Sequence, residues 1–405
     1  MASERSIFAE RGFAYYFGGQ TLSYVGDGLR TFALPLLVFH VTHSALSTGI
    51  TYALEIVPFA LVGLVGGSLA DRVDRRRMMI ACDLARFLIM AAFAIAYYRG
   101  WLTLPMLYVG IVLLASAAAI FLGGQQSSIP HLVGTSRSTK ATAALIAAEQ
   151  TTNLITPPIG GAIFSVAGPL PALVANACTY LISQFTLALV PTLGPDAPGP
   201  IPSLRVIAAD IARGFKYLTG DRALTAVTLT SFGLNLFGMM AVAVLIPFVK
   251  NDLSASDVVL GFAFGGISVG SILGALIAGR YASLWPFGIA LQIAYAVDAI
   301  IYIPVMFAHS VPVFVLFSAL ASASGSFQVA QIVGWRMRIT PSDKFGSVFG
   351  AARLVVLSGI GPGAYVGGLV AQNYDPRLSI IISEVGFLLI ALYMAFNRAI
   401  REERR

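Results

Sequence analysis

Acidic and basic side chains within long apolar runs are the residues of this sequence whose chemistry most needs an explanation. An ionised group inside a bilayer is costly, so one that is retained there is a candidate for ion transfer, substrate binding or pairing with an opposite charge. A carboxyl group in this setting can also exchange a proton. Nine such residues interrupt the apolar runs: Asp27, Arg30, Glu55, Asp83, Arg86, Glu149, Asp298, Arg353 and Glu384.

The elements that position these residues are twelve predicted membrane-spanning helices. Apolar residues make up 57% and charged residues 11% of the 405 residues, whereas soluble domains contain about 25% charged residues. A helix needs about 20 apolar residues to cross a bilayer. The predicted spans are 13–40, 46–70, 77–98, 104–128, 141–167, 170–193, 223–249, 257–280, 286–308, 311–334, 345–371 and 377–397. The sequence therefore predicts an all-α integral membrane protein.

The positions of the lysine and arginine residues predict the orientation of these spans. With both termini in the cytoplasm, most of the 26 lysine and arginine residues fall in cytoplasmic segments, as the positive-inside rule requires. The exceptions are Arg99, Lys250 and Arg377 in outer segments and Arg30, Arg86 and Arg353 within spans. We expect a multi-pass protein of the cytoplasmic (inner) membrane.

The densest charge cluster is the short loop between the second and third spans. Its arginines place it on the cytoplasmic side. The loop follows the pattern Gly67-x-Leu69-Ala70-Asp71-Arg72-x-x-Arg75-Arg76. This pattern resembles the loop 2–3 signature of the major facilitator superfamily, with Asp74 standing where the usual pattern has a second glycine.

The resemblance implies two pseudo-symmetric bundles of six helices with a substrate cavity between them. A weak repeat between the two halves of the sequence, with offsets just over 200 residues, is consistent with this fold. We expect an N-terminal bundle at 1–193, a linker at 194–222 and a C-terminal bundle at 223–405. The linker is proline-rich and ends in a predicted amphipathic helix on the cytoplasmic surface.

Four of the intramembrane residues lie on spans that line the cavity in this superfamily. The resemblance implies that Asp27, Arg30, Glu55 and Glu149 form a polar cluster, and the repeat places Arg353 at the position equivalent to Glu149. Arg30 and Glu55 are expected to pair, which leaves Asp27 with fewer partners. Asp27 and Glu149 are then the candidate proton carriers, and the alternative is an ion-pair network that only stabilises the N-terminal half.

A second group of charged residues is expected to form the cytoplasmic gate. Asp83 and Arg86 are three residues apart on the third span and can pair along one helix face. The resemblance implies that the Asp71 carboxylate contacts the start of the eleventh span when the cytoplasmic side is closed. The whole gate group is Gly67, Asp71, Arg72, Arg75, Arg76, Asp83 and Arg86.

The fifth span carries Pro157, Pro158, Gly160 and Gly161. This stretch resembles the antiporter signature of the superfamily, without its leading Gly-Pro pair. The alternative is that the glycines only allow close helix packing.

The sequence predicts a transporter and not an enzyme. Our first hypothesis is a proton-coupled antiporter that exports small amphipathic compounds, because the chain resembles the twelve-span drug, macrolide and siderophore efflux branch, whose members include multidrug exporters. A lipid or lysolipid transporter of the same fold is the alternative. Asp71 and Asp74, flanked by basic residues, make a poor metal site, and no ATP-binding motif is present. We expect a monomer with no cofactor, no metal and no nucleic-acid partner, and we expect Asp298 and Glu384 to be structural.

Overall fold

The computed structural model describes residues 7–70, 72–191, 193, 204–281, 286–341, 344–397 and 400. Within these residues the chain forms helices and no β-strand. The all-α fold expected from the composition is therefore confirmed.

The chain divides into two compact units, which are described separately. The first comprises Met1–Leu37 and Pro58–Pro202, and the second comprises Val38–Val57 and Ser203–Arg405. This division differs from the expected one because the end of the first helix and the first part of the second are grouped with the C-terminal helices. The physical reason is local packing, since Tyr52 shares a hydrophobic cluster with Ala243 and Ala364.

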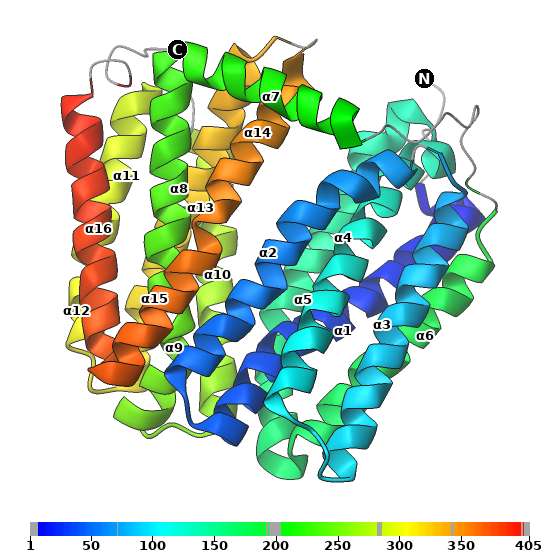
Figure 1. Ribbon diagram of the computed structural model, residues 1–405, viewed down its shortest axis with the longest axis horizontal. Coiled ribbons are helices and arrows are strands. Elements are labelled where there is room, and N and C mark those ends of the chain that lie inside the picture. Colours follow the sequence, from blue (N-terminus) through cyan, green and yellow to red (C-terminus); the bar gives the residue numbers. More distant parts are fainter. Residues whose placement is uncertain are drawn as a thin grey trace. The chain divides into compact units, whose positions relative to one another are not determined.

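The first unit is a helical bundle with its own hydrophobic core (Figure 1). Its α3 packs against α4 and α6, and its α5 packs against the same two helices. The core includes Phe13, Tyr16, Met79, Phe121 and Leu145. The elements are η1 (Ile7–Ala9), most of α1 (Arg11–Thr42), the second part of α2 (Ala45–Ala70), α3 (Arg75–Tyr98), α4 (Leu104–Val133), η2 (Thr135–Arg137), α5 (Ser138–Ala167) and α6 (Pro169–Ala188).

Two helix ends in this unit differ from the predicted spans. The fourth helix continues past residue 128 and ends at Val133, where Gly134 adopts a φ of 80°. Glycine takes this left-handed conformation without the steric strain of a Cβ atom. The sixth helix ends at Ala188 rather than at residue 193. Pro191 follows shortly afterwards, and a proline disfavours helical backbone at the residue before it.

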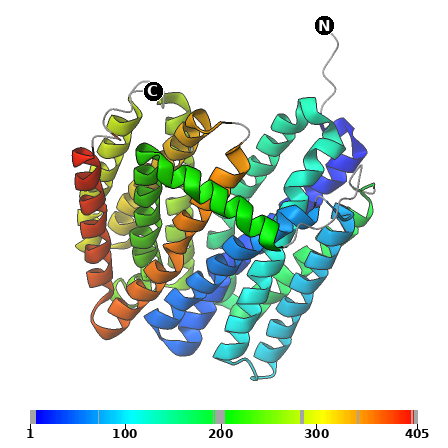
Figure 2. The ribbon, with the colours of Figure 1, turned by 45° about the horizontal axis from the view of Figure 1, so that its top comes forward.

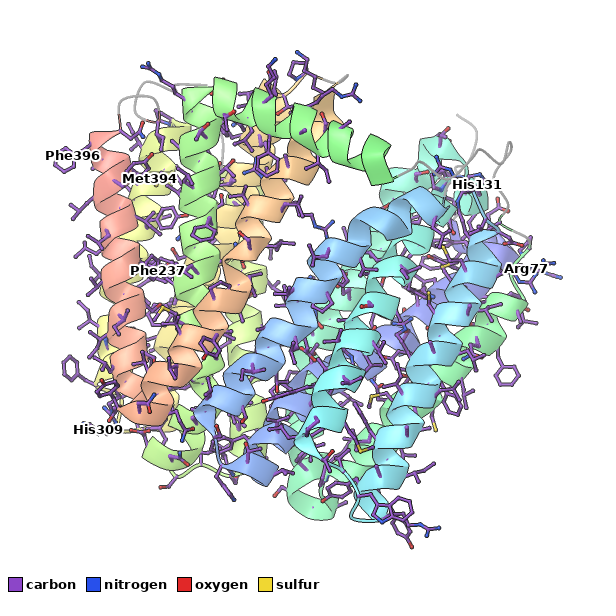
Figure 3. All side chains as sticks on the ribbon, in the orientation of Figure 1. Arg77, His131, Phe237, His309, Met394 and Phe396 are labelled. Atoms are coloured by element: carbon purple, nitrogen blue, oxygen red, sulfur yellow. The ribbon has the colours of Figure 1, made fainter. Side chains whose placement is uncertain are left out.

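The second unit contains the remaining helices. Phe287 and Trp335 stack in its core with ring centroids 4.7 Å apart. Figure 3 shows Phe237 and Met394 among the helices of this unit, whereas Phe396 points away from α16. The elements are α7 (Leu204–Gly220), α8 (Arg222–Ala243), α9 (Leu245–Pro247), the π-helical turn η3 (Phe248–Asp252), α10 (Asp257–Tyr281), α11 (Phe287–Ile301), α12 (Ile303–Met306), α13 (Val311–Ile339), α14 (Phe345–Ser358), α15 (Ile360–Asn373) and α16 (Pro376–Phe396).

The amphipathic linker helix is α7, which crosses the end of α14 in Figure 2. Gly214 of α7 lies against the Ser347 backbone. The Lys344 ammonium group lies 4.8 Å from the centroid of the Tyr217 ring. These contacts attach α7 to the C-terminal unit.

Close packing of α10 on α13 depends on glycine. A Cβ atom at Gly270 would collide with the Ala319 carbonyl group, so the two backbones approach closely at this point. Small residues allow such approaches in membrane helix pairs, where packing replaces the hydrophobic effect.

Eleven helical stretches of the described residues are long and apolar enough to cross a membrane. They match eleven of the twelve predicted spans, with α8, α9 and η3 forming one stretch, α11 and α12 another, and α14 and α15 a third. The exception is α5, a helix of 30 residues. Its glutamate, glutamine, asparagine and threonine residues lower its hydropathy, as expected for a helix that lines a polar site.

Candidate functional site in the N-terminal unit

Asp27 of α1 is the centre of a charged cluster in the first unit. Arg30 lies one turn further along the same helix, and its Nε atom is 3.6 Å from Asp27 Oδ1. Arg86 of α3 places Nη1 3.4 Å from Asp27 Oδ2. The Tyr180 hydroxyl group of α6 donates a hydrogen bond of 2.7 Å to Asp27 Oδ1. Three helices therefore converge on one carboxylate.

This geometry corrects two expectations from the sequence. The sequence predicts fewer partners for Asp27 than for its neighbours, and that prediction is wrong, because two guanidinium groups and a hydroxyl group contact it. The sequence also groups Arg86 with the cytoplasmic loop, but the structure joins it to Asp27. Depth along a helix does not reveal which neighbouring helix a long arginine side chain reaches.

Arg86 is almost completely enclosed. Its side chain is 2% exposed, and it forms an ion pair with Asp83, which is 0% exposed. Its guanidinium carbon lies 4.3 Å from the centroid of the Phe121 ring and 4.5 Å from that of the Tyr180 ring. The predicted pairing of Asp83 with Arg86 along α3 is confirmed. Such an enclosed cation needs its carboxylate, because breaking a buried pair leaves an uncompensated charge.

Glu149 of α5 is the third acid of this cluster. Its side chain is half-buried and interacts electrostatically with Asp27 and with Tyr24. Among the described residues, none donates a hydrogen bond to the Glu149 carboxylate or forms an ion pair with it. Within this part of the chain, Asp27 and Asp83 contact guanidinium groups and Glu149 contacts none.

A polar network next to this cluster was not anticipated from the sequence. Gln125 of α4 donates through Nε2 to Gln20 Oε1 at 2.8 Å and to the Tyr24 hydroxyl group at 2.7 Å. The Tyr16 hydroxyl group donates to the Gln125 carbonyl oxygen at 3.2 Å. The sequence signal for this network is the presence of Gln20 and Gln125 within two apolar spans. Amide groups inside a membrane need hydrogen-bond partners, so two such glutamines indicate a contact between their helices.

The fifth helix runs without a break through Pro157 and Pro158. Gly160 is buried, and a Cβ atom there would lie 2.9 Å from Phe32 Cδ1 and 3.5 Å from a Leu29 methyl group. Gly161 is also buried. The close approach of α1 and α5 brings Glu149 toward the Asp27 cluster.

Two charged residues at the start of α3, Asp74 and Arg75, make defined contacts. Asp74 caps α3 by accepting a hydrogen bond of 3.0 Å from the Arg76 backbone. Asp74 stands where the superfamily pattern has a glycine, and the cap gives that departure a structural role. The buried Arg75 side chain donates to the Ala70 carbonyl oxygen at 2.9 Å and contacts His131 at 3.0 Å.

The remaining residues of the expected gate are placed only in part. Gly67 lies in α2, and the backbone of Arg72 donates to the Leu69 carbonyl oxygen at 3.0 Å. Asp71 lies outside the described residues. Arg77 and His131 lie in this end of the first unit (Figure 3).

Glu55 and Arg353 both belong to the second unit. Glu55 is on α2 and Arg353 is on α14. The expected pairing of Arg30 with Glu55, and the expected equivalence of Glu149 and Arg353, each join the two units and stay predictions.

Comparisons with known proteins identify the class of molecule that carries this cluster. A model of the family described as transmembrane secretion effector, a major facilitator family, matches residues 2–404. The chain is 26% identical over 390 residues to the enterobactin exporter EntS of Escherichia coli O1:K1, covering 94% of this chain and 90% of that protein.

Solved structures show the same fold. One is a bacterial homologue of the human lysosomal transporter Spinster, in an inward-facing and unoccupied conformation, with a TM-score of 0.76, 14% identity and coverage of 100% of this chain and 99% of that chain. Another is a mutant of the nucleoside transporter NupG, with a TM-score of 0.77, 15% identity and coverage of 95% and 100%. The protein is thus a multi-pass membrane transporter and not an enzyme. The chain belongs to the transmembrane secretion effector family of the major facilitator superfamily.

Proposed function

We propose that this transporter exports small amphipathic compounds of the siderophore or drug type in exchange for protons. The relative named as an enterobactin exporter supports export as the direction and a siderophore as one substrate class. The charged cluster of the first unit supports protons as the coupling ion.

The observation that carries the proposal is the charge balance of that cluster. Among the described residues, Asp27 contacts the guanidinium groups of Arg30 and Arg86, and Asp83 contacts that of Arg86. Within the same residues, Glu149 interacts with Asp27 and contacts neither guanidinium group. An ionised Glu149 therefore adds a surplus negative charge that no arginine side chain of the described residues contacts. A single proton on Glu149 removes it, because the other two acids already contact arginine.

This balance suggests how a proton gradient drives transport. When Glu149 carries a proton this surplus charge is absent, and the helices can close around the cluster at lower electrostatic cost. When Glu149 releases the proton, the surplus charge favours a state in which water or a substrate group compensates it. A proton that binds from one side and leaves on the other therefore biases the equilibrium between the two states.

The polar network gives the site a means of holding a substrate. Gln20, Tyr24 and Gln125 present amide and hydroxyl groups next to the acids. The Gln20 Nε2 group finds no acceptor among the described residues. Gln20 is 1% exposed, so a substrate with hydroxyl or carbonyl oxygens would reach that donor only in a conformation that opens the network. Aromatic neighbours such as Tyr24 would suit the apolar part of the substrate.

The test is transport by the purified protein in proteoliposomes with an imposed pH gradient. The substrates are a catecholate siderophore, a macrolide, a lipophilic cationic dye and a lysolipid. We expect gradient-driven movement of at least one of the first three, and loss of that movement in Glu149→Gln. Glu10→Gln is the matched control, since Glu10 is an acid of the same unit that pairs with Arg137 at 3.0 Å on the surface.

Two results would overturn the proposal. Full gradient-driven transport by Glu149→Gln would show that Glu149 does not carry the coupled proton. Movement of the lysolipid alone, without dependence on pH, would indicate a lipid transporter of the same fold.

A further inference from the structure

The tip of the α1–α2 hairpin is grouped with the C-terminal helices rather than with the rest of its own bundle. The first unit holds α1 as far as Leu37, and the tip, Val38–Val57, belongs to the second unit. The tip contains the end of α1, the connection at His43 and Ser44, and the first part of α2. Both helices continue into the first unit, so the contacts of the tip attach them to the second.

The tip packs on α15 through glycine residues. A Cβ atom at Gly49 of α2 would collide with the Ala364 carbonyl oxygen. A Cβ atom at Gly368, one turn further along α15, would lie 2.8 Å from the Ala45 carbonyl oxygen. Small residues allow such backbone contact between membrane helices. These four residues carry no charge, so this packing holds the tip in place without responding directly to pH.

Next to this packing, one carboxylate of α10 has two basic partners from different elements. Asp257 Oδ1 lies 2.8 Å from Lys250 Nζ of η3 and 3.2 Å from His40 Nε2 of α1. Lys250 and Asp257 are neighbours in the chain, so His40 is the partner that joins the hairpin tip to α10. The His40 side chain is 41% exposed, whereas that of Asp257 is 11% exposed. The imidazole can therefore exchange a proton with the solution.

The helix ends at this contact favour a charged pair. His40 lies in the last turn of α1, and Asp257 lies in the first turn of α10. The negative end of a helix dipole stabilises a cation, and the positive end stabilises an anion. An imidazole gains its proton between about pH 5 and 8. A charged donor also forms a stronger hydrogen bond to a carboxylate than a neutral one. Acid should therefore strengthen the contact.

The charged groups around the contact show which of them opposes this gain. Asp252 of η3 pairs with Arg377 of α16 at 3.3 Å, so that acid is compensated. His43 lies edge-on to an aromatic ring at the end of α1. Lys250 shares the carboxylate oxygen with His40, so its charge repels a proton there. We expect this repulsion to reduce the gain and not to reverse it, because the carboxylate and both helix ends favour the charged pair.

We propose that the contact between His40 and Asp257 is a pH-sensitive latch, which attaches the hairpin tip to the second unit and closes when His40 is protonated. The glycine packing positions the two side chains, and the charge on the imidazole sets the strength of the contact. With both termini in the cytoplasm, as the sequence predicts, the tip lies on the outer side of the membrane. The latch then responds to acid on that side, and it is separate from the proton exchange proposed for Glu149.

The test is the distance between two spin labels on the purified full-length protein in lipid nanodiscs, measured by pulsed electron paramagnetic resonance. The labels are attached at Val41→Cys on the tip and Phe307→Cys on the second unit, both at exposed positions. The background carries Cys82→Ala and Cys178→Ala. We expect the ratio of attached to detached tip to rise about fivefold from pH 8 to pH 6, which corresponds to about 1 kcal/mol.

Three variants assign the response. His40→Gln keeps an amide donor and cannot become charged, so the ratio should not change with pH. Asp257→Asn removes the acceptor charge and should lose the response as well, which tests the contact from its other side. His43→Asn is the matched control, because it removes a second imidazole of the same tip and asparagine tolerates the positive φ of 49° at this position. It should respond like the wild type.

The proposal is overturned if the ratio in the wild type does not rise with acid, or if His40→Gln responds as the wild type does. Loss of the response in His43→Asn with its retention in His40→Gln would assign the proton to the other imidazole and would also overturn it. The measurement needs no substrate. In Glu149→Gln the response should persist, so failure of the latch and failure of the proposed export function are distinguishable.

Discussion

Asp83→Asn should be among the most damaging conservative substitutions in the first unit. The Asp83 side chain is fully buried and pairs with Arg86, which lies between two aromatic rings. The substitution keeps the size of the side chain and removes only its charge. Arg86 would then remain enclosed with a more distant partner, Asp27, at 3.4 Å.

The expected loss in the free energy of unfolding depends on the partner that Arg86 keeps. Breaking a buried ion pair by removing one partner costs about 3–5 kcal/mol, because the other charge stays buried. Asp27 still compensates part of the Arg86 charge, so we expect a loss of about 3 kcal/mol, the lower end of that range. Replacing both members of a buried pair by apolar residues of similar size is often nearly neutral. Asp83→Leu combined with Arg86→Met should therefore cost less than Asp83→Asn alone.

The assay is unfolding of the purified protein in mixed micelles with increasing dodecyl sulfate, followed by far-ultraviolet circular dichroism. Arg77→Met is the control, because Arg77 is 87% exposed and its contact with Asp74 spans 3.8 Å. Exposed pairs contribute about 0–1 kcal/mol, so this variant should unfold like the wild type.

The outcome that would refute this reasoning is a double variant that is less stable than Asp83→Asn. Arg86 would then stabilise the unit mainly through its aromatic contacts and its link to Asp27. The burial of an unpaired charge would not be the main cost of losing Asp83.

Three further predictions concern other parts of the chain. Asp74→Ala removes the cap of α3 and should cost about 0.5–2 kcal/mol, seen as faster hydrogen exchange confined to the first turn of that helix; unchanged exchange would show that the cap is dispensable. Gly270→Val should destabilise the protein by about 1–3 kcal/mol, because the valine side chain would meet the Ala319 carbonyl group. Gly279→Ala is the control, since Gly279 has open space around it, and equal melting temperatures of the two variants would contradict the packing argument. Asp71 lies outside the described residues, and Asp71→Asn should shift the transporter toward its inward-open state about tenfold if the contact inferred from the superfamily contributes about 1.4 kcal/mol. Distances between spin labels on the cytoplasmic loops test this, and an unchanged distance distribution would place the gate elsewhere.

The sequence by itself determined which segments cross the membrane and to which superfamily the chain belongs. Hydropathy is summed over about 20 neighbouring residues, so the spans follow from local sequence without knowledge of helix packing. The helix α5 shows the limit of hydropathy as a signal. Its polar residues lower its mean hydropathy, so it is not among the eleven stretches that are apolar enough to cross a membrane, although the sequence predicts a span at 141–167. The loop pattern from Gly67 to Arg76 identified the superfamily because its residue order is specific.

Only the tertiary structure decided which charged residues meet. Asp27 and Arg86 are 59 residues apart, and Asp298 and Gln328 are 30 residues apart, so their contacts depend on how helices rotate and pack. A periodicity of about 3.6 residues predicts the partner of Asp83 on its own helix, but it carries no information about the neighbouring helix that a side chain faces. That rotation is fixed by the fit of aromatic, glycine and small residues between helices, which only the folded chain shows.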